Sequence, residues 1–431
     1  MKTKLELISE RARREGKCRF TSLSHLLNES FLAKCYKELK RKKAPGVDGV
    51  SVEEYGKELE NNLQVLVKRM KGMKYYPQPV RRVYIPKGNG KLRPLGIPAV
   101  EDKVVQMGIS KILEAIFEND FLDVSYGFRP GRSCHDALKA FDRAVMRKPV
   151  SYVIEVDIRG YYDHIDHQWL MTCLKQRISD TSLLGLIWRN LKAGVFEEGR
   201  TIKTEKGAPQ GGIMSPILSN IYLHYILDLW FEKKLKKSLK GHAELIRYAD
   251  DFVICCQYKR EAHSILKELK DRLAKFGLEI AEEKTRVEKF GRFAKADAIK
   301  EGKKPATIEL LGFTHFCSTS RNGKFIVGRR TSGKRFRNQL KEINEWLRKI
   351  RNACPLIDWW RVLRSKLTGY YQYFGVSGNY RSISNYYDKV LHIIYKWWNR
   401  RSQKRSGNWI KFQSLLGLYP LPKPRIVCSL W

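Results

Sequence analysis

Two adjacent carboxylates stand between apolar runs in the stretch IRYADDFVICC, where Asp250 and Asp251 occupy the centre. Turns favour Asp because its side chain hydrogen-bonds the local backbone, so a plain hairpin tip is one interpretation. The flanking runs are short and rich in β-branched and aromatic residues, which is typical of fully buried strands. Two like charges held beside a buried sheet repel each other and require a cation. Mg²⁺ fits, because it takes oxygen ligands from one or two carboxylates together with substrate phosphates.

A second acidic position follows another apolar run. In SYVIEVDIRGYYD, residues 153–156 have the pattern of a buried strand, and Asp157 stands where that strand ends. One Asp at a strand end and an Asp pair in a neighbouring hairpin form the minimal ligand set for two metal ions. This ligand set predicts in-line phosphoryl or nucleotidyl transfer.

The composition indicates a folded protein that binds a polyanion. The chain has 431 residues, of which 43% are hydrophobic and 11% aromatic, enough for a substantial core and two or three domains. Lys and Arg number 83 against 45 Asp and Glu, a formal charge of +38. Such a surface gains affinity for nucleic acid through counterion release. We expect no membrane partner, because the sequence has no uninterrupted apolar run of about 18 residues.

The N-terminus and the cysteines indicate an intracellular protein. MKTKLELISERARREGKCRF is charged throughout and has no apolar segment of the kind found in secretory signals. The nine cysteines are scattered, without a CxxC pair or a Cys/His spacing typical of zinc sites. We therefore expect reduced cysteines and no structural zinc.

The elements that must position the aspartates can be placed along the chain. Residues 1–43 are predicted to be helical and basic, and PQPVRRVYIPKGNGKLRPLGIP predicts a hairpin with a basic rim. Helices are predicted after it, with Ser133 as an N-cap, near His167, and from Arg260 to Phe276. IELLGFTHF is predicted to be another buried strand. From about residue 326 the pattern is helical, and its clustered aromatic residues predict a packed bundle with basic side chains outside.

The order of these blocks resembles one family. DIRGYYD, PQGGIMSP, YADD and LGF are similar to the palm signature of reverse transcriptases. GVDGV, PKGNGKLRPLGIP and YGFRPGRS resemble the group II intron-encoded reverse transcriptase/maturase lineage in particular, and LTGYYQYFG is similar to its thumb, or maturase X, domain. YxDD alone is a weak signal, whereas seven blocks in order over nearly the whole chain are specific.

The resemblance implies an α+β fold of the right-hand polymerase type, with fingers, a palm containing an antiparallel sheet, and an α-helical thumb/maturase X domain. The expected division is a basic helical N-terminal extension (1–45), fingers (46–150), palm (151–325) and thumb (326–431). Many relatives continue into an HNH endonuclease with paired cysteines. This chain ends at PLPKPRIVCSLW without such pairs, so we expect no DNA-strand cleavage by it.

The resemblance also implies roles for individual residues. The metal ligands would be Asp157, Asp250 and Asp251 with the backbone carbonyl of Ile158, holding two Mg²⁺ ions, with Mn²⁺ as a substitute. The alternative for Lys87 and Arg93 is a solvated basic turn. The alternative for Tyr162 is a core tyrosine, and that for Lys284 is an exposed structural lysine. The expected nucleotide-binding residues are Lys87, Arg93, Tyr162 as an aromatic steric gate, Gln210, and Lys284 as a proton donor to pyrophosphate. The expected template or primer contacts are Arg129, Arg132, Gly211, Gly212, Leu311, Gly312 and Phe313. The stretch LLGF, residues 310–313, resembles the primer-grip hairpin of the family, and a plain core segment is the alternative.

These implications lead to a functional hypothesis. We expect an RNA-directed DNA polymerase that uses dNTPs, an RNA template and a DNA or RNA primer, and that also binds a structured intron RNA as a maturase. The expected location is the bacterial cytoplasm, with association with the nucleoid during action on DNA. Two alternatives remain open: a maturase that acts by RNA binding alone, and a domesticated relative in defence or DNA repair.

Overall fold

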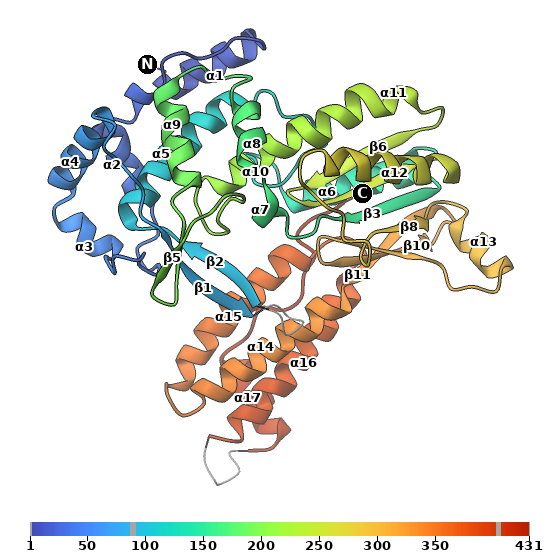
Figure 1. Cartoon of the computed structure of the whole chain (residues 1–431). Coiled ribbons are helices and arrows are strands. Elements are labelled where there is room, and N and C mark those ends of the chain that lie inside the picture. Colours follow the sequence, from blue (N-terminus) through green and yellow to red (C-terminus); the bar gives the residue numbers. More distant parts are fainter. Residues whose placement is uncertain (1, 87–91, 402–406, 431) are drawn as a thin grey trace.

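A computed structural model describes residues 2–86, 92–401 and 407–430, and its helices and strands are labelled in Figure 1. The helices, including the 3₁₀ segment η1 and the π-helical segments η2 and η3, are α1 (Lys4–Arg14), η1 (Ser24–Leu26), α2 (Glu29–Lys37), α3 (Val52–Lys57), α4 (Leu59–Lys71), α5 (Val100–Phe117), α6 (Cys134–Arg147), α7 (Tyr161–His164), α8 (His167–Leu174), α9 (Thr181–Leu191), α10 (Ser215–Leu223), η2 (His224–Asp228), η3 (Phe231–Leu235), α11 (Lys236–Ser238), α12 (Lys259–Ala274), α13 (Ala294–Lys300), α14 (Gly333–Ile350), α15 (Leu356–Phe374), α16 (Tyr380–Trp398) and α17 (Trp409–Leu418).

The strands form three sheets. Their bounds are β1 (Val80–Pro86), β2 (Leu92–Ile97), β3 (Tyr152–Asp157), β4 (Val195–Glu197), β5 (Arg200–Ile202), β6 (Ala243–Tyr248), β7 (Asp251–Cys256), β8 (Arg286–Lys289), β9 (Thr307–Leu310), β10 (Phe313–Thr319) and β11 (Phe325–Thr331). The sheet orders are β2-β1-β4-β5, β6-β7-β3-β8 and β11-β10-β9. All pairings are antiparallel except that of β1 with β4.

The sheet β6-β7-β3-β8, called the central sheet below, is buried as its sequence predicts. Every residue of β7 after Asp251 is buried, and so are residues 153–156 of β3. Runs that are buried at successive positions indicate strands covered on both faces. Helix α12 packs against β3 and β7, and a core of buried side chains joins these strands to the N-terminal helices. The central sheet is therefore a rigid support for the residues at its edge.

The C-terminal helices form a separate lobe. Figure 1 shows α14, α15, α16 and α17 standing away from the central sheet, with the β11 end of the small sheet beside them. The predicted aromatic core is confirmed, because Trp359, Trp360, Tyr371 and Trp397 are buried there. Trp398 is partly exposed. The boundary expected near residue 325 coincides with the start of β11, so the helices begin only at Gly333.

Several local predictions are confirmed and one is wrong. The hairpin of β1 and β2, the strand β3, the helix α12 and the Ser133 N-cap are present. Residues 1–43 are helical only in part, since loops separate α1, η1 and α2. The prediction of one strand through IELLGFTHF is wrong, because Leu311 and Gly312 form a turn between β9 and β10. Across the described ranges, no helix combines the length and apolarity needed to cross a membrane.

Candidate active site

Three aspartates meet at one edge of the central sheet. In the register of β3 and β7, Asp157 is paired directly with Asp251. In the hairpin of β6 and β7, Tyr248 pairs with Asp251, so Ala249 and Asp250 form the connecting turn. The cross-strand pairing explains why Asp157 and Asp251, 94 positions apart in the sequence, lie together, as predicted.

The turn is held from inside by a buried ion pair. Ala249 has φ of 56°, a left-handed conformation that costs roughly 1–2 kcal/mol for a residue with a Cβ. The side chains of Arg247 and Asp228 are 0% exposed, and Arg247 donates to both oxygens of Asp228 at 2.7 and 2.5 Å. Its Nη1 also donates to the carbonyl of Ala249 at 3.0 Å. The ion pair therefore fixes the turn that carries Asp250.

The loop of residues 125–132 supports the same turn from outside. The Tyr126 N–H donates to the Arg247 carbonyl at 2.8 Å, and the buried Asn220 amide donates to the Gly127 carbonyl at 2.7 Å. A Cβ on Gly127 would lie 2.4 Å from the backbone nitrogen of Ala249. Only glycine permits this approach, so the YGFRPGRS block is required to seat the YADD turn.

The site is electrostatically strained without a bound cation. Burial raises the pKa of Asp251 to about 7 and that of Asp250 above its ordinary value, and the neighbouring carboxylates add to both effects. The surface of Asp251 is open to water although protein atoms surround it, because it lies in a cavity of about 430 Å³. Asp157, Glu155, Lys284 and Arg286 also line this cavity. A cation bound between the carboxylates would oppose these pKa shifts and favour the charged form.

The donor types fit a hard divalent cation, although the aspartates do not form a closed ligand cluster. Among the described residues, no three acidic, His or Cys side chains are grouped closely enough to hold a metal by themselves. Lys284 Nζ lies 2.9 Å from Asp157 Oδ2, which shows that this carboxylate attracts a cation. The backbone bonds that flank Ile158 use the Asp157 carbonyl and the Arg159 N–H. Ligation by the Ile158 carbonyl therefore stays a prediction.

The expected nucleotide-binding residues lie around the aspartates. Tyr162 is half-buried, and its carbonyl accepts from the Ala208 N–H at 2.8 Å, which ties it to the APQGG loop. Arg93 is exposed on β2, and its charge lowers the pKa of both Asp250 and Tyr162 against the larger effect of burial, which indicates proximity. Gln210 accepts from the Gly96 N–H through its carbonyl at 2.7 Å. Lys87 lies outside the described residues.

Packing inside the protein explains why the APQGG loop has two glycines. Gly211 has φ of 107°, and a Cβ there would lie 2.7 Å from the Gly96 carbonyl oxygen of β2. A Cβ on Gly212 would lie 2.8 Å from Ser215 Oγ. Loop packing thus accounts for both glycines, and their contact with template or primer stays a prediction.

The predicted phosphate contact of Arg129 is wrong. Arg129 is buried, and its guanidinium donates to Glu118 and to the carbonyls of Leu122, Ser125 and Phe121, which uses all of its N–H groups. Arg129 therefore ties the loop of residues 125–132 to the interior of the protein. Arg132 is more accessible, with its guanidinium 2.5 Å from Asp123, so phosphate contact at this position stays a prediction.

The residues expected to contact the primer form the turn between β9 and β10. Leu311 and Phe313 are buried, and Gly312 is partly exposed. The Leu311 N–H lies 3.4 Å from Asp251 Oδ2, which places this turn at the aspartates. Sequence reasoning missed Arg247 and Asp228, although an arginine inside an apolar strand pattern is the signal that could have indicated a buried ion pair.

A sequence model described as reverse transcriptase (RNA-dependent DNA polymerase) matches residues 85–315, which contain all three aspartates and both supporting loops. The chain belongs to the reverse transcriptase family. The fold is accordingly the right-hand polymerase fold of this family. The central sheet with its aspartate turn is called the palm below, and the C-terminal helices α14–α17 are called the thumb. Reverse transcriptases use divalent metal ions, in agreement with the donor types at this site.

Individual relatives indicate the lineage within the family. The chain is 38% identical over 238 residues to protein YkfC of Escherichia coli (strain K12), covering 49% of this chain and 62% of that protein. It is 38% identical over 285 residues to group II intron-encoded protein LtrA of Lactococcus lactis subsp. cremoris, covering 66% and 45% respectively. A nuclear intron maturase 1 of Arabidopsis thaliana is 33% identical over 120 residues, 27% of this chain and 16% of that protein. These relatives confirm the resemblance to group II intron reverse transcriptases and maturases, and the matches span about half the length of the two bacterial ones.

Proposed function

We propose that this protein is an RNA-directed DNA polymerase that transfers nucleotides with Mg²⁺, or Mn²⁺ in its place. The observation that carries the proposal is the pairing of Asp157 with Asp251 beside the Asp250 turn, at the edge of a buried sheet. These three carboxylates would hold the metal, with the Ile158 carbonyl as a further ligand. When bound, two such ions activate an attacking hydroxyl and stabilise the leaving oxygen.

The surrounding residues support binding of a deoxynucleoside triphosphate. Arg93 carries a charge near Asp250, and a guanidinium is well suited to phosphate. The half-buried Tyr162 ring packs edge-on against Tyr161 at 5.3 Å, so it is held firmly enough to exclude a 2′-hydroxyl. Lys284, at the cavity that Asp157 lines, is positioned to give a proton to pyrophosphate. An RNA template and a DNA or RNA primer complete the expected substrates.

Primer extension on an RNA template tests the proposal. Wild type should extend a DNA primer with dNTPs in Mg²⁺ and fail with NTPs or in a chelator, whereas Asp250→Asn should lose extension by at least about 10³-fold. Asp271→Asn, the same chemical change on the exposed face of α12, is the matched control and should retain activity. Extension by Asp250→Asn at the wild-type rate would contradict the site assignment.

A maturase role is the second candidate, and the thumb favours it. Helix α14 carries six Lys or Arg against two Glu, and its only buried residues are Ile343 and Leu347, so most of the charge faces outward. Basic and aromatic side chains on such a surface suit structured RNA. The names of LtrA and of the plant intron maturase add support. Bacterial relatives and the charge of +38 support a place in the bacterial cytoplasm, with nucleoid association during action on DNA.

Splicing assays separate the two roles. Stimulation of group II intron splicing at low Mg²⁺ should survive Asp250→Asn, because RNA binding does not need the aspartates. Replacement of Lys334, Arg337 and Lys341 by Gln should weaken RNA binding and splicing stimulation together. Splicing that ignores these three changes would contradict a maturase surface on α14.

A further inference from the structure

The turn between β9 and β10 has an unfavourable backbone. Leu311 has φ of 51° and Gly312 has φ of 77°, so both central residues of a two-residue hairpin turn are left-handed. Such turns strongly prefer Asn-Gly, and a leucine in the first position is an outlier. Strained residues of this kind persist only when their surroundings hold them, and they concentrate at functional sites.

Three groups hold the turn, and two of them belong to the thumb. On the palm side, the Leu311 N–H lies 3.4 Å from Asp251 Oδ2. On the thumb side, the hydroxyl of Tyr373 in α15 donates to the Leu311 carbonyl at 2.9 Å. The N–H of Ser332, the N-cap of α14, donates to the Gly312 carbonyl at 3.0 Å. The turn is thus clamped between one aspartate of the candidate site and the starts or ends of two thumb helices.

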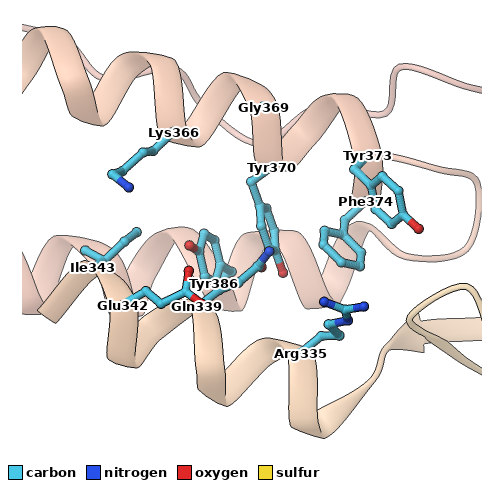
Figure 2. A pocket seen from close by; sticks show the side chains of 10 residues that line it. All are labelled: Arg335, Gln339, Glu342, Ile343, Lys366, Gly369, Tyr370, Tyr373, Phe374 and Tyr386. Carbon is cyan, nitrogen blue, oxygen red and sulfur yellow. The ribbon is translucent and has the colours of Figure 1, made fainter. Parts of the chain in front are cut away.

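Tyr373 is itself well fixed. Its ring is stacked on Phe313, the residue that follows the turn, at 6.0 Å and 12° between planes. Its backbone carbonyl lies 2.9 Å from Nε2 of His135, at the start of α6. The side chain keeps 37% of its surface exposed, at one end of a groove of about 490 Å³ between α14 and α15. Figure 2 shows Tyr373 and Phe374 at this end of the groove, with the Arg335 guanidinium directed toward them.

The groove and the turn share a residue. The Cγ of Arg335 lies 3.5 Å from the position that a Cβ on Gly312 would occupy, and Arg335 also lines the groove. A nucleic-acid strand that binds Arg335 would therefore contact a side chain that packs against the same turn that contacts Asp251. Arginine next to an open groove is suited to a phosphate of such a strand.

We infer that Tyr373 is a positioning residue, whose hydroxyl couples the placement of thumb helix α15 to the carboxylate of Asp251 through the Leu311 turn. This inference rests on the proposed polymerase function. Without the hydroxyl, the Leu311 carbonyl loses its partner, and the strained turn keeps one of its two thumb-side bonds, the one from the Ser332 N–H to the Gly312 carbonyl. Asp251 is then less well oriented for the metal, while the Tyr373 ring at the end of the groove is kept.

A pair of Tyr→Phe substitutions on the same helix tests the inference. Tyr373→Phe keeps the ring that stacks on Phe313 and removes only the hydroxyl. Tyr371→Phe is the matched control, because the buried Tyr371 hydroxyl has no hydrogen-bond partner in the described part of the chain. For each variant, single-nucleotide incorporation is measured against Mg²⁺ concentration at saturating primer–template, together with primer–template affinity by fluorescence anisotropy and the midpoint of thermal unfolding.

Tyr373→Phe should incorporate nucleotides about five- to tenfold more slowly at low Mg²⁺, the size of one lost hydrogen bond, and should need several-fold more Mg²⁺ for half-saturation. Its primer–template affinity should stay within about twofold of wild type, and Tyr371→Phe should match wild type throughout. An unchanged Mg²⁺ dependence in Tyr373→Phe would overturn the inference, as would a loss confined to primer–template affinity. Absence of incorporation by wild type would instead refute the polymerase function.

Discussion

Breaking the buried ion pair of Arg247 and Asp228 should destabilise the protein strongly. Both side chains are 0% exposed and are joined by two hydrogen bonds of 2.7 and 2.5 Å. Unit charges about 4 Å apart attract by about 4 kcal/mol at an effective dielectric constant near 20. Removing one partner of such a pair leaves the other charge buried and costs about 3–5 kcal/mol. We therefore expect Arg247→Met and Asp228→Leu each to lower the free energy of unfolding by about that amount.

The double variant Arg247→Met/Asp228→Leu should separate stability from activity. Apolar residues of similar volume can replace a buried ion pair at little or no cost in stability, so the free energy of unfolding should return most of the way to wild type. The bond from Arg247 Nη1 to the Ala249 carbonyl is still missing, and that bond fixes the turn carrying Asp250. Misplacement of a reacting group by about 1 Å can cost about 10²-fold in rate. We expect the double variant to fold and to lose at least about tenfold in nucleotide incorporation.

Urea unfolding followed by tryptophan fluorescence and circular dichroism, together with primer extension, measures both effects. The exposed pair of Lys270 and Glu282 gives the control, because its side chains are 43% and 74% exposed and such pairs contribute at most about 1 kcal/mol. Lys270→Met/Glu282→Leu should therefore leave both measurements near wild type. Single variants of Arg247 or Asp228 as stable as wild type would refute the electrostatic reasoning. Wild-type incorporation by the double variant would refute the role of Arg247 in holding the turn.

Three further predictions follow from the structure. Gly127→Ala places a Cβ 2.4 Å from the Ala249 nitrogen, so it should lower the free energy of unfolding by about 1–3 kcal/mol and reduce primer extension, and unchanged unfolding would contradict the required close approach. Burial lowers the pKa of His224 to about 4, so its neutral form favours folding above an unfolded pKa near 6.5. Wild type should then lose stability relative to His224→Leu by about 1.4 kcal/mol per pH unit as the pH falls from about 6.5 to 4, and a constant difference in urea unfolding would contradict this. Affinity for an RNA–DNA duplex should fall by about 10³-fold or more between 50 and 200 mM salt, and a flat log–log plot of anisotropy data would argue against a polyanion partner.

The sequence was sufficient to predict elements whose residues carry an unambiguous local signal. The runs beside Asp157 and Asp251 are apolar except at Glu155, a pattern typical of a doubly covered strand, and both strands are present. The hairpin of β1 and β2 follows from β-type runs on either side of a Gly-rich turn. The proximity of Asp157 to the Asp250 and Asp251 pair was predictable because carboxylates at the ends of neighbouring strands can share a metal.

Other features depend on contacts that no local pattern records. The apolar pattern alone predicted one strand through β9 and β10, because Leu311 is an unusual residue for a left-handed turn. Only the family resemblance implied a hairpin at LLGF. Arg129 lies in a basic, Gly-rich segment, a pattern that favours phosphate contact. In the structure it instead forms an ion pair with Glu118 of the preceding segment, inside the protein. The ion-pair partner of Arg247 is Asp228, which lies 19 residues earlier in a π-helical segment. The sequence alone does not distinguish Asp228 from other acidic residues as that partner.

Backbone strain marks the candidate site independently of its charges. Five non-glycine residues of the described chain have positive φ, and three of them, Phe128, Ala249 and Leu311, belong to the loop and the two turns that meet at the aspartates. Two of these three residues are held by named contacts: Gly127 packs on Ala249, Arg247 binds the Ala249 carbonyl, and Tyr373 binds the Leu311 carbonyl. Because the strain is balanced by contacts from the palm core and the thumb, the geometry of Asp250 and Asp251 is a property of the assembled molecule rather than of the YADD segment. This explains why YxDD alone is a weak signal of a polymerase, whereas the ordered set of supporting blocks is a strong one.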